Sequence, residues 1–301
     1  MRIRILTLVI LFSALLLTTI SFAEPLVVAV ARGLTEENIQ LKTLVEKETF
    51  VNWKVITGPI SFEEIKDATV VIFVKADALL KLSEEEIDAL VKWFNEGGKT
   101  LWVAGDSDYG DEGPPRQATI NRILEAVGSK LRIESGAVED PTSNAGKPYR
   151  VLGLPACAHS RVRFLVAKID RALFHGPAAV IAYVNGEYVR LEESEIEGIY
   201  PVMCTSEDGI IVNHNPPDPE AHGVGEFGSF VLMAIEFMKD KNNFVIVTGD
   251  APYDHYLGMY KPELKVKERY TEEYPQQGEL LVRRLISLAT KPELFKVLLG
   301  G

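Results

Sequence analysis

Short apolar segments alternate with amphipathic segments through the first 130 residues, and this alternation constrains the fold more than any other feature. Apolar stretches at residues 25–30, 53–57, 69–75 and 99–104 are predicted strands. Residues 69–75, TVVIFVK, form a continuous β-branched run, which is typical of a strand buried on both faces. Such strands belong to parallel sheets that are covered by helices on each side.

The segments between these strands carry helix signals. Ser83 and Glu86 form a capping box, and the apolar residues behind them recur at helical spacing up to the pair Gly97-Gly98. Helices are also predicted over residues 35–48, from Ser61, and over residues 118–127. The alternation predicts an α/β fold with a mostly parallel, flavodoxin-like sheet flanked by helices.

Beyond Gly128 the pattern changes to short strands without intervening helices. These predicted strands are residues 149–154, 162–167, 178–184, 187–191, 201–206 and 209–213. Asn185-Gly186 predicts one tight hairpin, and Glu207-Asp208 joins the last two strands in a second. Residues 229–237 and 244–248 are predicted as paired strands and residues 278–289 as a closing helix. We therefore expect residues 24–301 to form a single domain with an antiparallel β-rich insertion at about 141–228.

Two strand ends share one pattern, an apolar run followed by Gly-Asp and an acidic, aromatic loop. The first is KTLWVAGDSDYG at residues 99–110, and the second is FVIVTGDAPYDH at residues 244–255. Ligands of open α/β sheets bind outside the carboxyl ends of strands, although Gly-Asp is also ordinary turn chemistry. The candidate ligand-binding residues are Asp106, Ser107, Asp108, Tyr109, Asp250, Tyr253, Asp254 and His255.

The tyrosines of these loops allow two interpretations. Tyrosines beside carboxylates bind sugars or peptides by stacking and hydrogen bonding. They also serve simply to cover the end of a sheet, since tyrosine is often partly buried.

The same loops are candidates for a catalytic or a metal site. Clustered aspartates suit Ca²⁺ or Mg²⁺, but the run from Asp106 to Asp111 lacks the glutamate that closes a calcium loop. The five histidines show no i, i+4 pair for zinc, and Gly223-Val-Gly225 precedes a strand where a phosphate loop would precede a helix. Ser107 lies between two aspartates and outside any G-x-S-x-G elbow. We expect no catalytic residue, no metal and no cofactor.

The N-terminus predicts export. Arg2 and Arg4 precede an uncharged apolar run to Phe22, and Ser21 and Ala23 are small residues at cleavage positions. Residues 1–23 are therefore predicted to be a signal peptide, with a retained N-terminal membrane anchor as the alternative. The mature protein is then secreted or extracytoplasmic.

The two cysteines, Cys157 and Cys204, have two interpretations. An even pair in an oxidising compartment predicts one disulfide. Two buried thiols acting as small hydrophobic side chains are the alternative.

The net charge is −11, and no basic stripe is present, which argues against a nucleic-acid partner. Glutamine is scarce while glutamate and lysine are abundant, which favours a heat-adapted source.

The order of elements resembles the class I glutamine-amidotransferase-like superfamily, in its exported GldG-like or DUF4350-like branch. The matching residues are LSEEEIDALVKWFNEGG at 82–98 with the following KTLWVAGDSDYG, residues 200–213 and 228–236, and FVIVTGDAPYDHY with the closing helix. The resemblance implies a non-catalytic protein associated with ABC-type transport. Active amidotransferases place a nucleophilic cysteine on a tight turn after a strand, whereas Gly-Asp stands at both strand ends here.

The leading hypothesis is an exported, non-catalytic binding or accessory protein whose partner is a membrane transporter or a surface-complex subunit. The alternative is an extracellular hydrolase that uses clustered carboxylates or a metal at the strand-end loops, and a third hypothesis is a purely structural partner domain. Convergence of the aspartates around a cleft would favour the hydrolase.

Overall fold

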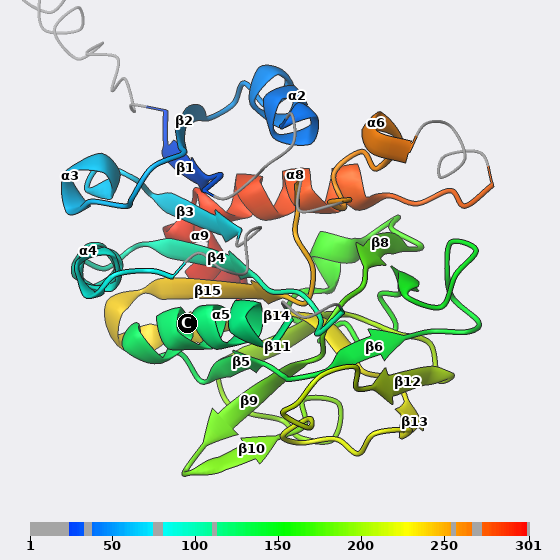
Figure 1. Ribbon diagram of the computed structural model, residues 1–301. Helices are drawn as coiled ribbons and strands as arrows, with labels where there is room; N and C mark the ends of the chain where they lie inside the picture. The colour runs from blue at the N-terminus through cyan, green and yellow to red at the C-terminus, as the bar shows by residue number, and fades with distance from the viewer. Residues whose placement is uncertain are drawn as a thin grey trace, which may run out of the picture.

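A computed structural model describes residues 24–32, 38–74, 81–109, 113–253, 257–266 and 273–299. Its centre is a seven-stranded sheet (Figure 1). In spatial order the strands are β11 (Ile199–Cys204), β14 (Val231–Met238), β15 (Asn243–Thr248), β4 (Thr100–Ala104), β3 (Val70–Val74), β1 (Leu26–Val30) and β2 (Asn52–Ile56). The five strands from β15 to β2 run parallel, whereas β14 and β11 pair antiparallel. The predicted α/β fold with a mostly parallel central sheet is confirmed.

Helices cover both faces of this sheet, because alternate strand residues point to opposite sides. Along β1, Val27 and Ala29 belong to one hydrophobic cluster and Val28 and Val30 to another. The first cluster contains side chains of α2 (Ile39–Lys47) and α8 (Gly278–Ala289). The second contains side chains of α3 (Phe62–Ile65), α4 (Glu84–Phe94) and α5 (Gly113–Ala126).

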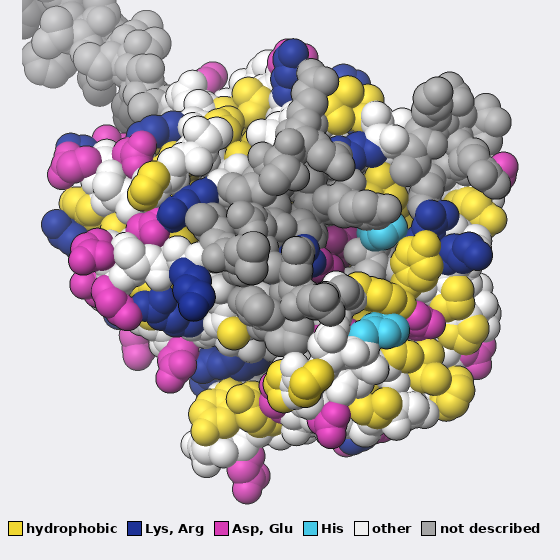
Figure 2. All heavy atoms as spheres, viewed as in Figure 1, with side chains coloured by type: hydrophobic (Ala, Val, Ile, Leu, Met, Phe, Trp, Pro, Cys, Tyr) yellow, Lys and Arg dark blue, Asp and Glu magenta, His cyan; other side chains and the backbone are white. Residues whose placement is uncertain are grey.

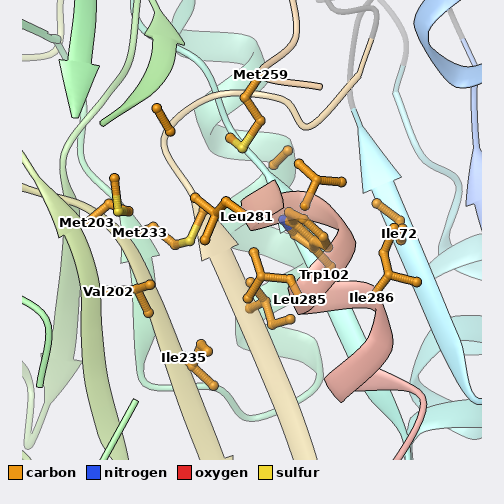
Figure 3. Packing of buried hydrophobic residues seen from close by; sticks show 14 of the residues in the cluster. Ile72, Trp102, Val202, Met203, Met233, Ile235, Met259, Leu281, Leu285 and Ile286 are labelled. Carbon is orange, nitrogen blue, oxygen red and sulfur yellow. The ribbon is translucent and has the colours of Figure 1, made fainter. Parts of the chain in front are cut away.

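The core against α8 is built around Trp102 of β4, which is fully buried. Leu281, Leu285 and Ile286 of α8 point toward this indole, and Met233 of β14 lies in the same cluster (Figure 3). The indole Nε1 donates a hydrogen bond to the Thr248 hydroxyl at 3.2 Å. The closing helix therefore packs onto the strands whose ends carry the two Gly-Asp sequences.

Smaller antiparallel sheets hold the other described strands. They are β10 (Glu187–Val189), β9 (Val180–Val184) and β5 (Leu131–Ile133) in one sheet, β13 (Phe227–Gly228), β12 (Gly209–Val212) and β6 (Ala137–Glu139) in a second, and β7 (Arg150–Gly153) with β8 (Ala172–His175) in a third. Short helical elements complete the described chain: η1 (Arg163–Val166), η2 (Lys239–Lys241), α6 (Glu263–Val266) and α9 (Pro292–Leu298).

The predictions beyond Gly128 were partly wrong. Residues 162–167 were predicted as a strand, but they contain the 3-10 helix η1, whose buried Leu165 and Val166 explain the apolar run. Residues 201–206 and 209–213 were predicted as one hairpin. Instead β11 pairs with β14, and β12 pairs with β6 and β13. Helix α5 begins at Gly113, five residues before its predicted start at Ala118.

Two predictions about the N-terminal region lie outside the described residues. The predicted signal peptide at residues 1–23 is one, and the start of the helix predicted over residues 35–48 is the other. Within the described ranges, no helix combines the length and the apolar character that crossing a membrane requires.

Candidate functional site

The two Gly-Asp sequences lie side by side where β4 and β15 end, and we call residues 105–109 and 249–253 the crest. The Gly105 amide donates to the Thr248 carbonyl at 2.8 Å across these parallel neighbours. A Cβ at Gly249 would lie 2.0 Å from the Ala178 carbonyl oxygen, and one at Gly105 would lie 2.8 Å from the Ile133 side chain. Both glycines are therefore required, because β5 and the segment before β9 pack directly onto the crest.

Asp250 is completely buried at the end of β15. Its Oδ2 accepts the backbone N–H of His175 and its Oδ1 that of Ala251, each at 2.6 Å. Burial raises the pKa of Asp250 well above its ordinary value, and the Asp106 carboxylate raises it further, whereas the two N–H bonds lower it. Asp250 therefore holds a proton over a wider pH range than an ordinary aspartate and fixes the end of β8 to the crest.

Asp106, at the end of β4, is also buried but carries an ion pair. Its Oδ2 lies 2.6 Å from Nη1 of Arg116 on α5, and its Oδ1 accepts the Ser107 N–H at 2.9 Å. The two aspartates thus converge, and they occupy different electrostatic environments. Asp106 lies beside a guanidinium, whereas Asp250 is surrounded by backbone N–H donors and the Asp106 carboxylate.

Asp108 turns away from this pair toward the loop that follows β12. Its Oδ2 accepts the N–H of His214 at 2.5 Å and that of Asn215 at 2.9 Å, and the Asn215 amide donates back to the Asp108 carbonyl. Asp108 is fully buried, and its Oδ1 has no hydrogen-bond partner in the part of the chain that the structure describes. This carboxylate therefore fastens a loop that is more than 100 residues away in sequence.

A chain of four rings covers the crest beside these carboxylates. The Tyr109 ring lies 4.1 Å from that of His214 and 5.7 Å from that of Tyr149, which in turn lies 5.6 Å from the His175 ring. The Tyr109 hydroxyl donates to Glu139. Burial, followed by this hydrogen bond, raises the pKa of Tyr109, so the phenol stays protonated. We call these four residues the ring cluster.

The remaining predicted site residues are placed differently. Ser107 is buried, and its hydroxyl accepts the Tyr109 N–H at 3.4 Å. Tyr253 is fully buried, with its hydroxyl 3.4 Å from the carbonyl oxygens of Val30 and Ile72, so it packs against the strand ends. Asp254 and His255 lie outside the described residues.

The described carboxylates do not form a metal site. No three histidine, cysteine, aspartate or glutamate side chains among the described residues come together as ligands for a metal ion. Of the predicted aspartates that the structure describes, Asp106 and Asp250 converge and Asp108 does not.

Cys157 and Cys204 are joined in a disulfide, so the first of the two interpretations of the cysteine pair holds. Cys204 is fully buried at the end of β11, and its Sγ accepts the Cys157 N–H at 3.2 Å. These are the chain's two cysteines, so neither thiol is free.

The sequence did not predict several residues that contact the crest. They are Arg116, Glu139, Tyr149, His175 and His214, none of which is among the candidate residues predicted from the sequence. No local signal links these residues, because their partners at the crest are brought to them by the fold from distant positions.

A separate cavity of about 1160 Å³ lies away from the crest, among residues 191–201 and 236–241. Its walls carry both charges, including Glu195 and Glu197 as well as Lys130, Arg161 and Lys239. No crest residue lines it. It therefore adds nothing to the candidate site.

Comparison with known proteins places the chain by fold only. No family model matches, and no curated protein matches. Among solved structures, the mmIFT52 N-terminal domain is 13% identical, with a TM-score of 0.56 over 88% of this chain and 97% of that chain. A putative GMP synthase protein from Thermoplasma acidophilum is 9% identical, covering 92% of this chain and 99% of that chain. Its TM-score of 0.42 is too low to support an argument.

Proposed function

We propose that this chain is an exported, non-catalytic binding or accessory protein built on an amidotransferase-like scaffold. Its partner is a membrane transporter of the ABC type or a cell-surface complex, and the crest is the surface that meets a ligand or partner.

The strand order supports the scaffold. The parallel strands follow the order β2-β1-β3-β4-β15, which is the flavodoxin-like order 2-1-3-4-5 of doubly wound sheets. The crest lies at the carboxyl ends of these strands, where ligands bind in such folds. Export is supported by the composition of the N-terminus and by the disulfide, since disulfides persist in oxidising compartments.

One observation carries the non-catalytic half of the proposal. The position where an amidotransferase needs an exposed thiolate holds Gly-Asp, while both cysteines of the chain are bonded to each other elsewhere. Two of the crest carboxylates, Asp108 and Asp250, already accept hydrogen bonds from backbone N–H groups of another segment of the chain. His214, at one end of the ring cluster, is exposed, and the other three rings are partly buried.

A specific observation favours a second candidate, an extracellular hydrolase. Burial and the Asp106 carboxylate raise the pKa of Asp250, and Asp106 itself is ion-paired with Arg116. Two neighbouring carboxyl groups in different environments are the arrangement of an acid–base pair. Both oxygens of Asp250 are occupied by N–H donors and shielded from solvent, which disfavours direct contact with a substrate.

The partner is tested by cross-linking the native protein in its membrane fraction and identifying what co-purifies. We expect a transporter or surface-complex subunit that is recovered less with His214→Ala. The control is Phe227→Ala, a similarly exposed ring on β13 that takes no part in the ring cluster. Recovery of the protein alone from the medium would contradict the transporter link.

The hydrolase is tested on the purified full chain with glutamine and with chromogenic peptides and glycosides. We expect no turnover. Hydrolysis that Asp250→Asn or Asp106→Asn abolishes, with the thermal midpoint unchanged, would replace the binding function by the enzymatic one.

A further inference from the structure

A pair of exposed tyrosines lies on the β9–β10 hairpin, away from the crest. Strand β9 leaves the crest near Ala178 and ends at the Asn185-Gly186 turn, across which Tyr183 pairs with Tyr188. The two ring centroids are 4.9 Å apart, and the rings are inclined by 56°. Tyr183 is 38% exposed and Tyr188 46%, and neither hydroxyl bonds a described residue. In Figure 2, hydrophobic side chains lie beside Lys or Arg side chains at the lower left, where Figure 1 places this hairpin.

The hairpin is held in place without these rings. On the opposite face of the same small sheet, Leu131, Val180 and Ala182 are fully buried in the hydrophobic cluster beneath α5. A cross-strand aromatic pair stabilises a hairpin on its own, but that role needs neither free hydroxyls nor an organised cation beside the rings.

Such a cation is present. The Arg132 guanidinium lies 5.8 Å from the centre of the Tyr183 ring. Its Nη1 donates to the carbonyls of Ser129 at 2.6 Å and Leu131 at 2.7 Å, which fixes the plane of the group. Its Nε and Nη2 donate to no residue that the structure describes, so two oriented donors remain beside the exposed rings.

The charges around the rings disfavour a charged ligand: the Arg132 guanidinium beside Tyr183 repels a cation. Glu220 and Glu125 lie close enough to Tyr188 to act on its hydroxyl, and the whole chain carries a net charge of −11, so an anion is disfavoured. Exposed aromatic faces next to hydroxyl and guanidinium donors match a pyranose, which has an apolar C–H face and a rim of hydroxyl groups.

We propose that Tyr183, Tyr188 and Arg132 form a binding site for a neutral oligosaccharide. The site goes beyond the proposed function, since it uses a different face of the molecule and none of the crest residues. Pyranose rings stack on the tyrosines, and their hydroxyl groups bond the tyrosine hydroxyls and the two remaining donors of Arg132.

The test is a heteronuclear NMR titration of the full chain with maltohexaose and, separately, cellohexaose. We expect saturable shifts centred on the amides of Tyr183, Tyr188 and Arg132 with at least one hexaose, with a dissociation constant on the order of 1 mM. Tyr188→Ala weakens binding about tenfold or more, whereas Tyr188→Trp retains it because the stacking face is kept. Phe227→Ala and the ring-cluster variant His214→Ala leave the titration unchanged, so failure of this site and failure of the proposed function are distinguishable.

Three results would overturn the proposal. They are the absence of saturable shifts with both hexaoses, shifts that Tyr188→Ala leaves intact, and a concentration-dependent mass that Tyr188→Ala reduces to that of a monomer. The last result would make the tyrosine pair a contact between copies of this chain. Equal thermal midpoints for wild type and Tyr188→Ala establish that lost binding does not reflect lost folding.

Discussion

His222 is buried between two carboxylates that come from separate segments of the chain. Its Nδ1 lies 2.5 Å from Glu134 and its Nε2 lies 2.5 Å from Glu192. The second Glu134 oxygen accepts the backbone N–H groups of Ala221 and His222. Burial disfavours the charged imidazole, but the bonds to both glutamates outweigh it and raise the pKa of His222 to about 9. The charged imidazolium therefore holds the loop before β13 against the end of β5.

This triad makes stability depend on pH in a defined direction. Because the pKa of His222 rises from 6.5 to about 9 on folding, its contribution is complete below pH 6.5 and is lost as the pH rises through about 9. After allowance for solvent screening, the contribution is roughly 2 kcal/mol. Urea unfolding of wild type and His222→Gln between pH 6 and pH 10 measures it as the difference between the two free energies of unfolding.

The difference between the two proteins is the informative quantity, because every other titratable group is present in both and its contribution cancels. We expect the variant to be less stable than wild type near neutral pH. The difference between their free energies of unfolding should become smaller above pH 9. A gap that stays constant with pH would show that His222 contributes only packing.

At the scale of elements, α4 shows how local sequence decides one boundary. The Ser83 hydroxyl accepts the Glu86 N–H at 3.3 Å, and Glu86 Oε2 accepts the Ser83 N–H at 3.0 Å. Glu86 also accepts the Ile60 N–H at 3.0 Å and pairs with Arg32, so the cap joins α4 to two neighbouring loops.

Removing the capping hydroxyl should lower stability without changing the fold. Ser83→Ala leaves one N–H of the first turn without its side-chain acceptor, which costs about 1 kcal/mol in the free energy of unfolding. Chemical denaturation measures the loss, and Ser194→Ala, at an exposed serine that caps no described helix, is the control. Equal losses in the two variants would show that the cap contributes nothing.

Elements with local signals were predictable from the sequence, and elements defined by distant partners were not. The strands β1 to β4 and helix α4 have their apolar spacing and end signals within their own residues. By contrast, β11 was assigned the wrong partner because its true neighbour, β14, lies almost 30 residues further along the chain. The η1 segment was predicted as a strand because an apolar run also fits a short helical turn that packs against α8.

The same limit applies to the candidate site. The aspartates at the two strand ends were predictable, and Asp106 and Asp250 do converge. The partners of these aspartates were not predictable. Asp250 accepts the backbone N–H of His175, which is 75 residues away in sequence, and Asp108 accepts that of His214, which is 106 residues away. A Gly-Asp sequence gives no indication that its glycine lies against Ala178 and that its aspartate fastens another strand.

At the scale of the whole molecule, the parallel sheet and the β-rich segment share their core. One hydrophobic cluster contains Val27 and Trp102 from the parallel strands together with Val138, Val151 and Phe174 from the smaller sheets. Because the parallel sheet and the β-rich segment contribute side chains to one contiguous core, loss of packing in the β-rich segment should also destabilise the parallel sheet.

The disulfide is the most direct means of testing this coupling. It joins residues 47 positions apart and connects the segment before η1 to the edge strand β11. Closing a loop of that length stabilises the folded state by about 2–4 kcal/mol, chiefly by restricting the unfolded chain.

We therefore expect reduction of the disulfide to lower the urea concentration at which the protein unfolds. Unfolding should remain a single transition, whether it is measured by tryptophan fluorescence or by far-ultraviolet circular dichroism. The Cys157→Ala/Cys204→Ala double variant should unfold at the same urea concentration as the reduced protein. Adding reductant should not change the transition of this variant. Two separated transitions after reduction would contradict the shared core, because the β-rich segment would then unfold without the parallel sheet that contains Trp102.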